Sequence, residues 1–374
     1  HSDVVPAQLE KWSHPPFEGI SEGDDLWGRG ALDMKGLGVI HLLAFLELHR
    51  SGLPLKRDVI LLVVADEETG GAFGSSWMLD NHFELFEDVG IVLAEGGTNL
   101  VQEGQLSYVG IERAQKVPLW LRLVVQGVPG HGSIPREHAP TARLVKALSR
   151  VLAEPEPFHV EPLVSLYFDR IAPFHSDPLA SVLRDIEEAA AEEDGPLEIG
   201  PYYAALLRNT VALTVLSAGE ATNIVPGLAF AELDCRLLPG QDISRFLAGV
   251  TAAIDDPAVQ IQTLLRGRAA TSPPSPVLED AVRQGLEKVG VEAEVGPSVL
   301  PGFTDSRLFR MRGIPAYGFS PFRTESGYAL GVHGDDERIS VADFRFGLEL
   351  FREVVFGLVL PAAESREAED VTDP

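Results

Sequence analysis

The chain has 374 residues, which is long for one hydrophobic core and favours two domains, and its 45% hydrophobic and 23% charged content is ordinary for a globular protein. Its 56 Asp and Glu residues against 30 Lys and Arg give a formal net charge of −26, which argues against nucleic-acid partners and against anionic membranes. A single cysteine, Cys235, excludes an internal disulfide framework, and no apolar run approaches the ~20 residues of a membrane span.

The first part of the chain predicts the start of an α/β domain. Residues 1–5 are predicted to end a strand, and the alternation of side chains along a strand places His1 and Asp3 on the same face. Apolar residues at near-helical spacing predict a helix over 34–50, which ends before Pro54. A strand followed by a helix begins the alternating pattern of α/β folds.

Two continuous apolar runs follow, at 58–65 and 90–94, and both are typical of strands buried on both faces of a parallel sheet. Glu67 and Glu68 come after the first run, and Glu95 comes directly after the second. Because ligand sites of open α/β sheets lie at the carboxyl ends of strands, we expect these carboxylates to meet the histidine and aspartate of the first strand at one edge.

The pattern changes near Lys116, where half-exposed strands replace the buried ones. Residues 155–208 are predicted to be a mostly helical insert, and Cys235 to be a small buried strand residue. The other predicted elements are strands at 119–126, 210–217, 228–237 and 259–265 and helices at 139–152 and 243–254. Two helices on a small, mainly antiparallel sheet is the simplest arrangement, so we assign 116–268 to an inserted α+β domain.

The α/β pattern resumes after a Pro-rich linker at 268–275. Its predicted elements are helices at 277–289, from about 302 and at 340–360, with strands at 291–295 and 314–319. Residues 1–115 and 269–360 therefore form one α/β domain with a mostly parallel sheet, interrupted by the inserted domain. The acidic, Pro-ended residues 361–374 are predicted to be a disordered tail.

The glycine-rich stretch 28–36 contains Asp33, and glycine lets the backbone turn sharply and approach a ligand closely. Zinc takes histidine nitrogen and carboxylate oxygen, and two-metal hydrolases share a bridging carboxylate. We interpret Asp33 as that bridge. The candidate ligands are His1, Asp33, Glu68, Glu95 and His333. None is specific alone, because a lone histidine is usually a surface or core residue, but each lies at a predicted strand end or in a glycine-rich loop.

Several motifs together resemble the M20 metallopeptidases, the dinuclear zinc carboxypeptidases and aminoacylases, in order from residue 1 to about 360. They are His1-Ser2-Asp3-Val4-Val5-Pro6, Gly28 to Gly36, Asp66-Glu67-Glu68-Thr69-Gly70-Gly71, Gly130-His131-Gly132-Ser133, Asn223-Ile224-Val225-Pro226, Asp234-Cys235-Arg236, Thr304-Asp305-Ser306-Arg307 and His333 to Arg338. Trp12, Pro16, Phe17, the Glu95-Gly96-Gly97 turn and the insert at 155–208 look most like the carboxypeptidase S and N-acyl-amino-acid hydrolase branch.

The resemblance implies a zinc-peptidase-like catalytic domain that holds two zinc ions per chain, with cobalt or manganese as possible substitutes. Asp33 would bridge the ions, His1 and Glu95 would complete one, and Glu68 and His333 the other. Asp3 would orient the His1 imidazole. Glu67 would be the general base, taking a proton from the metal-bridging water and returning it to the leaving amine.

The resemblance also implies roles for the inserted domain as a lid and dimerisation domain. His131 would polarise the scissile carbonyl, often from the partner subunit of a homodimer. Asn223, Arg236 and Thr304 would hold the carboxylate or backbone of the substrate. Without the resemblance, His131 would be a surface turn residue and Arg236 a surface strand residue. Arg307 remains open between a substrate contact and a structural ion pair.

The expected function is therefore zinc-dependent hydrolysis of an amide bond next to an amino acid with a free carboxylate, of the carboxypeptidase or dipeptidase type. N-acyl-amino-acid hydrolysis, the chemistry of aminoacylases, is the alternative. A non-catalytic relative that binds metal or an amino acid is an alternative of another class. Because the chain begins without Met inside a predicted strand, we expect residues before His1. Unless residues before His1 contain a targeting segment, we expect a cytoplasmic protein.

Overall fold

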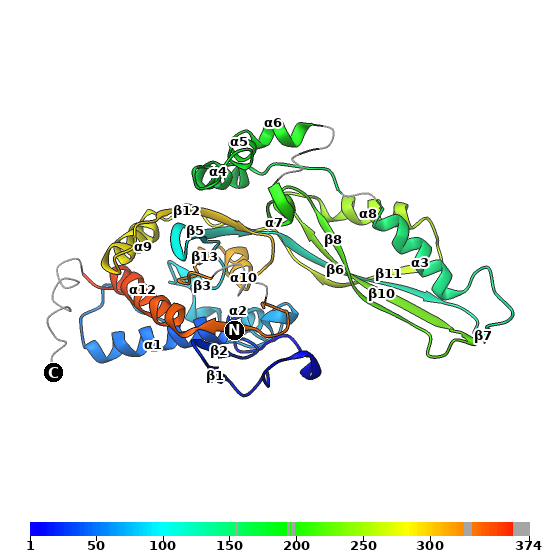
Figure 1. Cartoon of the computed structure of the whole chain (residues 1–374), viewed down its shortest axis with the longest axis horizontal. Helices are drawn as coiled ribbons and strands as arrows, with labels where there is room; N and C mark the ends of the chain where they lie inside the picture. The colour runs from blue at the N-terminus through cyan, green and yellow to red at the C-terminus, as the bar shows by residue number, and fades with distance from the viewer. Residues whose placement is uncertain (154–155, 193–194, 196–198, 325–330, 362–374) are drawn as a thin grey trace. The chain divides into compact units, whose positions relative to one another are not determined.

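The computed structural model describes residues 1–153, 156–192, 195, 199–324 and 331–361 (Figure 1). The chain divides into two compact units. His1–Arg113, Ser272–Ser298 and Thr304–Pro374 form unit 1, and Ala114–Thr271 with Val299–Phe303 form unit 2. Unit 1 is thus built from segments on both sides of unit 2. Apart from its first residue, the predicted tail at 361–374 lies outside the described residues.

Unit 1 contains a mixed sheet with the strand order β12-β5-β13-β3, in which β4 also pairs with β5. Strand β13 runs parallel to β3 and antiparallel to β5, and β4 runs antiparallel to β5. The strands are β3 (Val92–Ala94), β4 (Leu100–Gln102), β5 (Gln105–Gln115), β12 (Glu294–Leu300) and β13 (Ala316–Gly318). The sheet is therefore mixed, and the prediction of a mostly parallel sheet is wrong for the described residues.

Strand β5 was not predicted, because Glu112 and Arg113 interrupt its apolar pattern. In the fold the Glu112 side chain is fully buried. Arg310 donates to both of its oxygens, at 2.7 and 2.6 Å, and so supplies the partner that a buried carboxylate requires.

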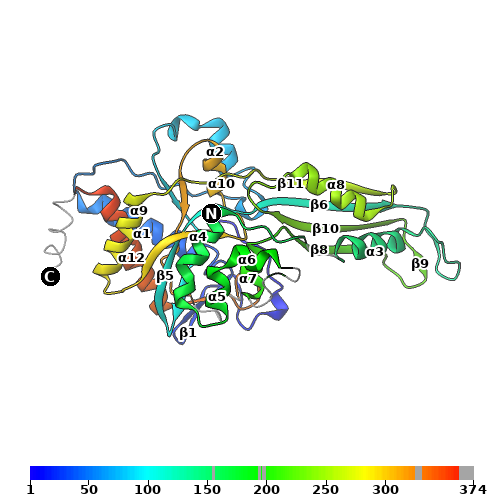
Figure 2. The same ribbon diagram turned by 90° about the horizontal axis from the view of Figure 1, so that it is seen from above.

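Three long helices build the core of unit 1 around this sheet. They are α1 (Lys35–Ser51), α9 (Pro276–Lys288) and α12 (Val341–Val359), each within two residues of its predicted bounds. Helices α9 and α12 lie side by side (Figures 1 and 2). Ile40, Leu350 and Val354 are completely buried among them. Shorter helices are α2 (Ser75–Asn81), α10 (Ser306–Met311) and the 3₁₀ turns Leu9–Lys11, Glu67–Thr69 and Phe83–Leu85.

The apolar run at 58–65 departs most from its prediction. It belongs to no strand ladder among the described residues. The predicted strand at 1–5 is likewise not part of a ladder there. The Ile60 and Val63 side chains are 55% and 65% exposed. Ser2 N donates to Val64 O at 2.8 Å, which ties the two segments together. The prediction of burial on both faces is therefore wrong here, because an apolar run becomes buried only where a neighbour covers it.

A small sheet with the order β1-β2-β14 joins two distant parts of unit 1. Its strands are β1 (Ile20–Glu22), β2 (Asp25–Trp27) and β14 (Arg338–Ser340), and Arg338 pairs in register with Trp27. This pairing brings the chain after His333 beside the glycine-rich stretch that contains Asp33. The sequence analysis did not predict it.

Unit 2 is built on a four-stranded antiparallel sheet with the order β11-β6-β10-β8. Helices α3 (Pro140–Val151) and α8 (Ile243–Ile254) share its core, so the predicted antiparallel sheet with two helices is present. Cys235 is fully buried in that core. The strands are β6 (Val117–Gln126), β8 (Thr210–Ala218), β10 (Leu228–Leu237) and β11 (Val259–Arg266), with a separate pair of β7 (Gly130–His131) and β9 (Ile224–Val225).

The insert between α3 and β8 is mostly helical, as predicted. It contains α4 (Pro162–Ile171), a 3₁₀ turn (Ala172–Phe174), α5 (Leu179–Arg184), α6 (Ile186–Ala191) and α7 (Gly200–Ala205), shown in Figure 2. The buried Lys116 ammonium donates to Ala205 O, Arg208 O and Thr210 Oγ1 at 2.8–2.9 Å, which anchors the end of this insert. Among the helices that the structure describes, none is both long and apolar enough to cross a membrane.

Candidate metal centre

The five predicted metal ligands all lie in unit 1, on loops and turns next to regular elements. Asp33 precedes α1, Glu68 lies in the 3₁₀ turn that follows the extended run at 58–65, and Glu95 follows β3. His333 lies in the loop before β14 and adopts a left-handed backbone conformation, with φ of 58°. Segments from both ends of the chain thus contribute to one cluster.

Asp33 lies between the two histidines. Its Oδ1 is 3.3 Å from His1 Nε2, and its Oδ2 is 3.1 Å from His333 Nε2. His333 Nε2 is also 3.2 Å from Glu68 Oε2. The two carboxylate oxygens of Asp33 therefore face two different sets of side chains, which is the arrangement that a bridging ligand requires.

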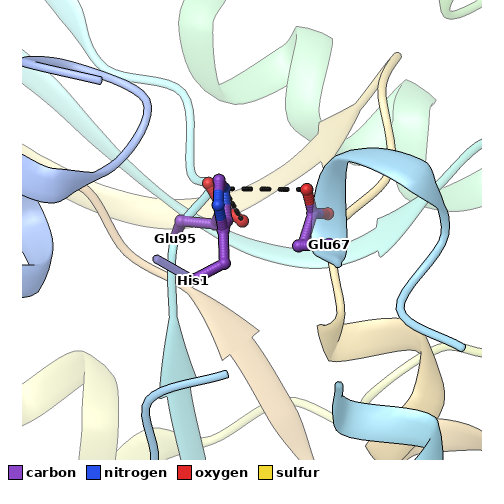
Figure 3. A group of neighbouring side chains, drawn as sticks. All are labelled: His1, Glu67 and Glu95. Atoms are coloured by element: carbon purple, nitrogen blue, oxygen red, sulfur yellow. Dashed lines mark ion pairs between the residues drawn. The ribbon is translucent and has the colours of Figure 1, made fainter. Parts of the chain in front are cut away.

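The His1 side faces two further carboxylates, as Figure 3 shows. His1 Nε2 is 3.5 Å from Glu95 Oε1 and 3.6 Å from Glu67 Oε2. The His1 side chain is 1% exposed, and Glu67 is 5% exposed. Glu67 is therefore about as close to the imidazole as the predicted ligand Glu95.

These side chains fit a divalent cation. Two ligand atoms about 2.1 Å from one tetrahedral zinc ion lie roughly 3.4 Å apart, close to the separations around both histidines. Donor atoms of two residue sets, His1/Glu67/Glu95 and His1/Asp33/Glu68, lie within 4.8 Å of one another. His1 Nε2, Glu67 Oε1 and Glu68 Oε1 are buried without a hydrogen-bond partner in the described part of the chain. Buried polar atoms of this kind are costly unless a ligand satisfies them.

Asp3 lies behind His1, on the side away from the cluster. Its Oδ1 is 3.3 Å from His1 Nδ1, and its two oxygens accept hydrogen bonds from the backbone N–H groups of Glu67 and Glu68, at 3.3 and 3.1 Å. A carboxylate in this position holds the imidazole so that Nε2 points at the cluster. It also ties His1 to the turn that carries the two glutamates.

The cluster is strongly negative, and the pKa values of its members reflect this. Burial lowers the pKa of His1, but contacts with Asp33 and Glu95 outweigh it and raise the pKa to about 12. Hydrogen bonds to Asp33 and Glu68 raise the pKa of His333 to about 10. Burial and the charge of Glu95 raise the pKa of Glu67 to about 9. A site that holds imidazolium ions this firmly also attracts a divalent cation.

Of the predicted substrate-binding residues, His131, Asn223 and Arg236 lie in unit 2, and Thr304 and Arg307 lie in unit 1. Strand β7 pairs with β9, so that His131 lies opposite Ile224, and Gly132 N donates to Asn223 O at 2.7 Å. His131 and Asn223 are thus brought together, and both are exposed. Ser133 Oγ lies 2.7 Å from His131 Nδ1, which leaves the Nε2 side of the ring toward solvent.

Arg236 lies on β10 of unit 2 and has an acidic neighbour. Its Nε and NH2 donate to the two oxygens of Asp234 at 2.6 and 2.7 Å, and its guanidinium lies 4.6 Å from the centre of the Phe303 ring. The side chain is 19% exposed. These contacts fix the guanidinium in one orientation.

Thr304 and Arg307 are each 4% exposed; Thr304 lies in the turn before α10, and Arg307 lies in the first turn of α10. Thr304 Oγ1 accepts a hydrogen bond from Ser306 N at 3.2 Å. Arg307 NH2 donates to Gly70 O at 2.6 Å, so this guanidinium supports the turn after Glu67 and Glu68. The contact favours the structural alternative for Arg307.

Three charged residues beside the centre were not predicted from the sequence to have a role. Asp305 is a buried carboxylate within the Thr304 motif, and a Cβ added to Gly71 would come within 2.4 Å of its Oδ1. Arg29 and Glu337 form a buried ion pair, with NH1 2.7 Å from Oε2. Each of the three lies in a motif that was selected because of a different residue. A charged neighbour within such a motif is the feature of the sequence that could have identified them.

The sequence of this chain is similar to that of known proteins. Residues 1–356 match the model of the family described as Peptidase family M20/M25/M40. The N-fatty-acyl-amino acid synthase/hydrolase PM20D1 of Mus musculus is 30% identical over 377 residues, covering 95% of the chain and 72% of that relative. The Probable carboxypeptidase S-like 2 of Dictyostelium discoideum is 27% identical over 369 residues, covering 95% of the chain and 70% of that relative.

A likeness to solved structures supports the fold. The crystal structure of the M20 family metallo-carboxypeptidase Sso-CP2 from Sulfolobus solfataricus superposes with a TM-score of 0.67 at 21% sequence identity. The match covers 94% of this chain and 82% of that one. The α/β fold class predicted from the sequence is therefore confirmed.

Proposed function

The chain belongs to peptidase family M20/M25/M40 and is a metal-dependent hydrolase, and from this we propose that it cleaves an amide bond next to an amino acid with a free carboxylate. We propose the carboxypeptidase or dipeptidase type. The observation that carries the proposal is Asp33, whose two oxygens face His1 and His333 separately, at 3.3 and 3.1 Å.

We propose that two zinc ions bind per chain, with cobalt or manganese as substitutes. Asp33 would be shared, His1 and Glu95 would complete one ion, and Glu68 and His333 the other. The contacts of His333 with Asp33 and Glu68 support the second set. When bound, the ions supply electrophilic assistance to the scissile carbonyl and lower the pKa of a water molecule.

Glu67 is the proposed proton carrier. Its carboxyl is buried beside the cluster, and its Oε1 has no hydrogen-bond partner among the described residues. Burial and the charge of Glu95 raise the pKa of Glu67 above its ordinary value. With cations bound to offset the neighbouring negative charge, the Glu67 carboxylate would keep a raised proton affinity. A group that takes a proton from water and returns it to the leaving amine needs this affinity and this freedom.

Residues of unit 2 are proposed to bind the rest of the substrate. His131 would donate to the carbonyl oxygen as negative charge develops on it, and Arg236 with Asn223 would bind the carboxylate. Support comes from the solvent-facing edge of the His131 ring and from the preset orientation of Arg236. Thr304 remains a weaker candidate, because it is almost completely buried.

We also propose a homodimer through unit 2. Strand β8 lies at the edge of the four-stranded sheet, and Leu213, Val215 and Leu216 on it are 37%, 39% and 57% exposed. An edge strand with apolar side chains and free backbone groups is a ready surface for pairing with a second copy. The molar mass in solution, measured by light scattering, tests this.

N-acyl-amino-acid hydrolysis is the second candidate function. It is favoured by the relative from Mus musculus, whose name is that of an N-fatty-acyl-amino acid synthase/hydrolase. The bond cleaved and the free carboxylate are the same, and the acyl group differs. A non-catalytic relative is disfavoured, because Glu67 and all five candidate ligands are present.

The experiment measures zinc content and hydrolysis on a panel of dipeptides and N-acyl amino acids, each paired with its C-terminal amide. We expect two zinc ions per chain, and at least about tenfold slower hydrolysis of every amide-capped substrate, because a charge-assisted contact is lost. Equal rates for capped and free substrates would contradict carboxylate recognition. Two bound ions without any turnover would favour the non-catalytic relative.

A further inference from the structure

The carboxylate of Glu337 is fully buried and accepts hydrogen bonds from the turn that carries Asp33. Its Oε2 accepts from Gly30 N at 2.8 Å, and its Oε1 accepts from Leu32 N at 2.7 Å and from Asp33 N at 3.0 Å. Arg29 NH1 adds a charged donor at 2.7 Å. One side chain therefore defines the path of the backbone on the approach to the candidate bridging ligand.

Glu337 also belongs to the loop that carries His333, four residues earlier. The same loop is tied back to the Asp33 turn by Arg29, whose NH2 donates to Gly334 O at 2.6 Å. Gly28 N donates to Glu337 O at 2.9 Å. The Arg29–Glu337 pair is thus a direct connection between the segments that supply two of the proposed ligands.

The loop needs such support because it includes unusual backbone. His333 and Asp336 have φ of 58° and 59°, in the left-handed region that residues other than glycine rarely adopt. Asp336 is held by Ser13, whose N and Oγ donate to its carboxylate at 2.7 and 2.8 Å. Conformations of this kind persist only where surrounding contacts hold them in place.

We propose that Glu337, clamped by Arg29, is a positioning residue that sets the separation of Asp33 and His333 and thereby the affinity of the cation they share. The inference rests on the proposed function in one respect only, which is that Asp33 and His333 bind the same ion. Glu337 touches backbone atoms and a guanidinium in this site, so it acts through the ligands.

A second buried pair in unit 1 separates this role from general stability. Glu112 and Arg310 are as deeply buried as Glu337 and Arg29, with side chains 0% and 1% exposed against 0% and 2%. Glu112 accepts from Gly318 N at 3.2 Å and from Arg310, and it holds strand β13. It bonds to neither the Asp33 turn nor the His333 loop in the contacts described. Glu112→Gln is therefore a matched control for Glu337→Gln.

The test measures cation binding directly and needs no substrate. Wild-type protein, Glu337→Gln and Glu112→Gln are stripped of metal and titrated with cobalt(II), followed by its visible absorption, and with zinc against a chromophoric chelator. We expect Glu337→Gln to weaken binding of the cation that Asp33 and His333 share about 10–100-fold and to change the cobalt spectrum, as loss of a supporting contact typically does. Glu112→Gln should lower the melting temperature and leave affinity and spectrum unchanged.

Arg29→Lys is the second variant, for use if Glu337→Gln does not fold. Lysine keeps the positive charge but lacks the planar fork whose NH1 and NH2 reach Glu337 and Gly334 O, so a several-fold loss of affinity is expected. Unchanged cation affinity in the folded variant would overturn the inference and leave the proposed function intact. A wild-type chain that binds no divalent cation would overturn both.

Discussion

The candidate residues of unit 1 and of unit 2 are held in different ways. In unit 1 the ligands contact one another directly, with Asp33 within 3.3 Å of His1 and within 3.1 Å of His333. In unit 2 His131 is exposed on a short strand pair, and Arg236 is paired with Asp234 of its own strand. The candidate cation ligands therefore lie together within unit 1, whereas the fold presents the candidate substrate-binding groups of unit 2 singly. Substitutions in the two regions should differ accordingly.

The largest effect is expected from Glu67→Ala in unit 1. Turnover should fall about 10³-fold, because proton transfer is lost, while the zinc content stays at the wild-type value. Enzyme assays with metal analysis on the same sample check both. Glu68→Ala is the comparison, because it should lose one ion. If Glu67→Ala keeps full turnover, the proton-transfer role is wrong, and if it loses zinc, Glu67 is a ligand.

His131→Ala tests the exposed region of unit 2. We expect kcat to fall about 10²-fold, with cation affinity unchanged, because a donor to the developing oxyanion is removed. His138→Ala replaces another exposed histidine of the same segment and should have no effect. Equal activity of the two variants would indicate that His131 is a surface turn residue without a role in catalysis.

Arg236→Met should act on substrate binding. We expect KM to rise about 10–100-fold for substrates with a free carboxylate and much less for their amides, because a charged hydrogen bond is lost. Arg122→Met is the matched control, since Arg122 pairs with Glu232 and lies 5.2 Å from the Phe230 ring on the same sheet. A similar rise in KM for both variants would point to a structural effect.

The smallest effect concerns stability in unit 1, away from the cluster. His41 stacks on Phe351 at 4.3 Å, and burial lowers its pKa from 6.5 to about 4. Because the unfolded chain takes up this proton first, stability is fully present above pH 6.5 and is lost as the pH falls toward 4. The loss is at most roughly 3 kcal/mol.

His41→Phe keeps the ring and removes the titration. It should therefore flatten the fall in melting temperature between pH 6.5 and 4, measured by calorimetry. His49→Phe, which changes an exposed histidine at the end of the same helix, should leave that fall as it is. An unchanged slope in His41→Phe would exclude His41 as the cause.

Much of the candidate site was predictable from local patterns. Asp33 lies between glycines just before a helix, and Glu95 directly follows an apolar strand. These positions are typical of ligand sites at the carboxyl ends of strands in α/β sheets. Helices α1, α3, α8, α9 and α12 were equally clear, because an amphipathic period over ten or more residues depends on few other parts of the fold. The α/β class and the antiparallel sheet with its two helices follow from these features, and the candidate ligands were selected from them.

Contacts between residues far apart in the sequence decided the rest. Glu112 is buried in a strand only because Arg310, 198 positions later, neutralises it. Residues 58–65 are apolar enough for a central strand, yet Ile60 and Val63 remain exposed where no described strand covers them. Nothing in the sequence around Glu337 indicates that its carboxylate accepts hydrogen bonds from three backbone N–H groups about 305 residues away. Local sequence determines which residues can bind or turn, whereas burial, charge pairing and ligand spacing are properties of the assembled chain.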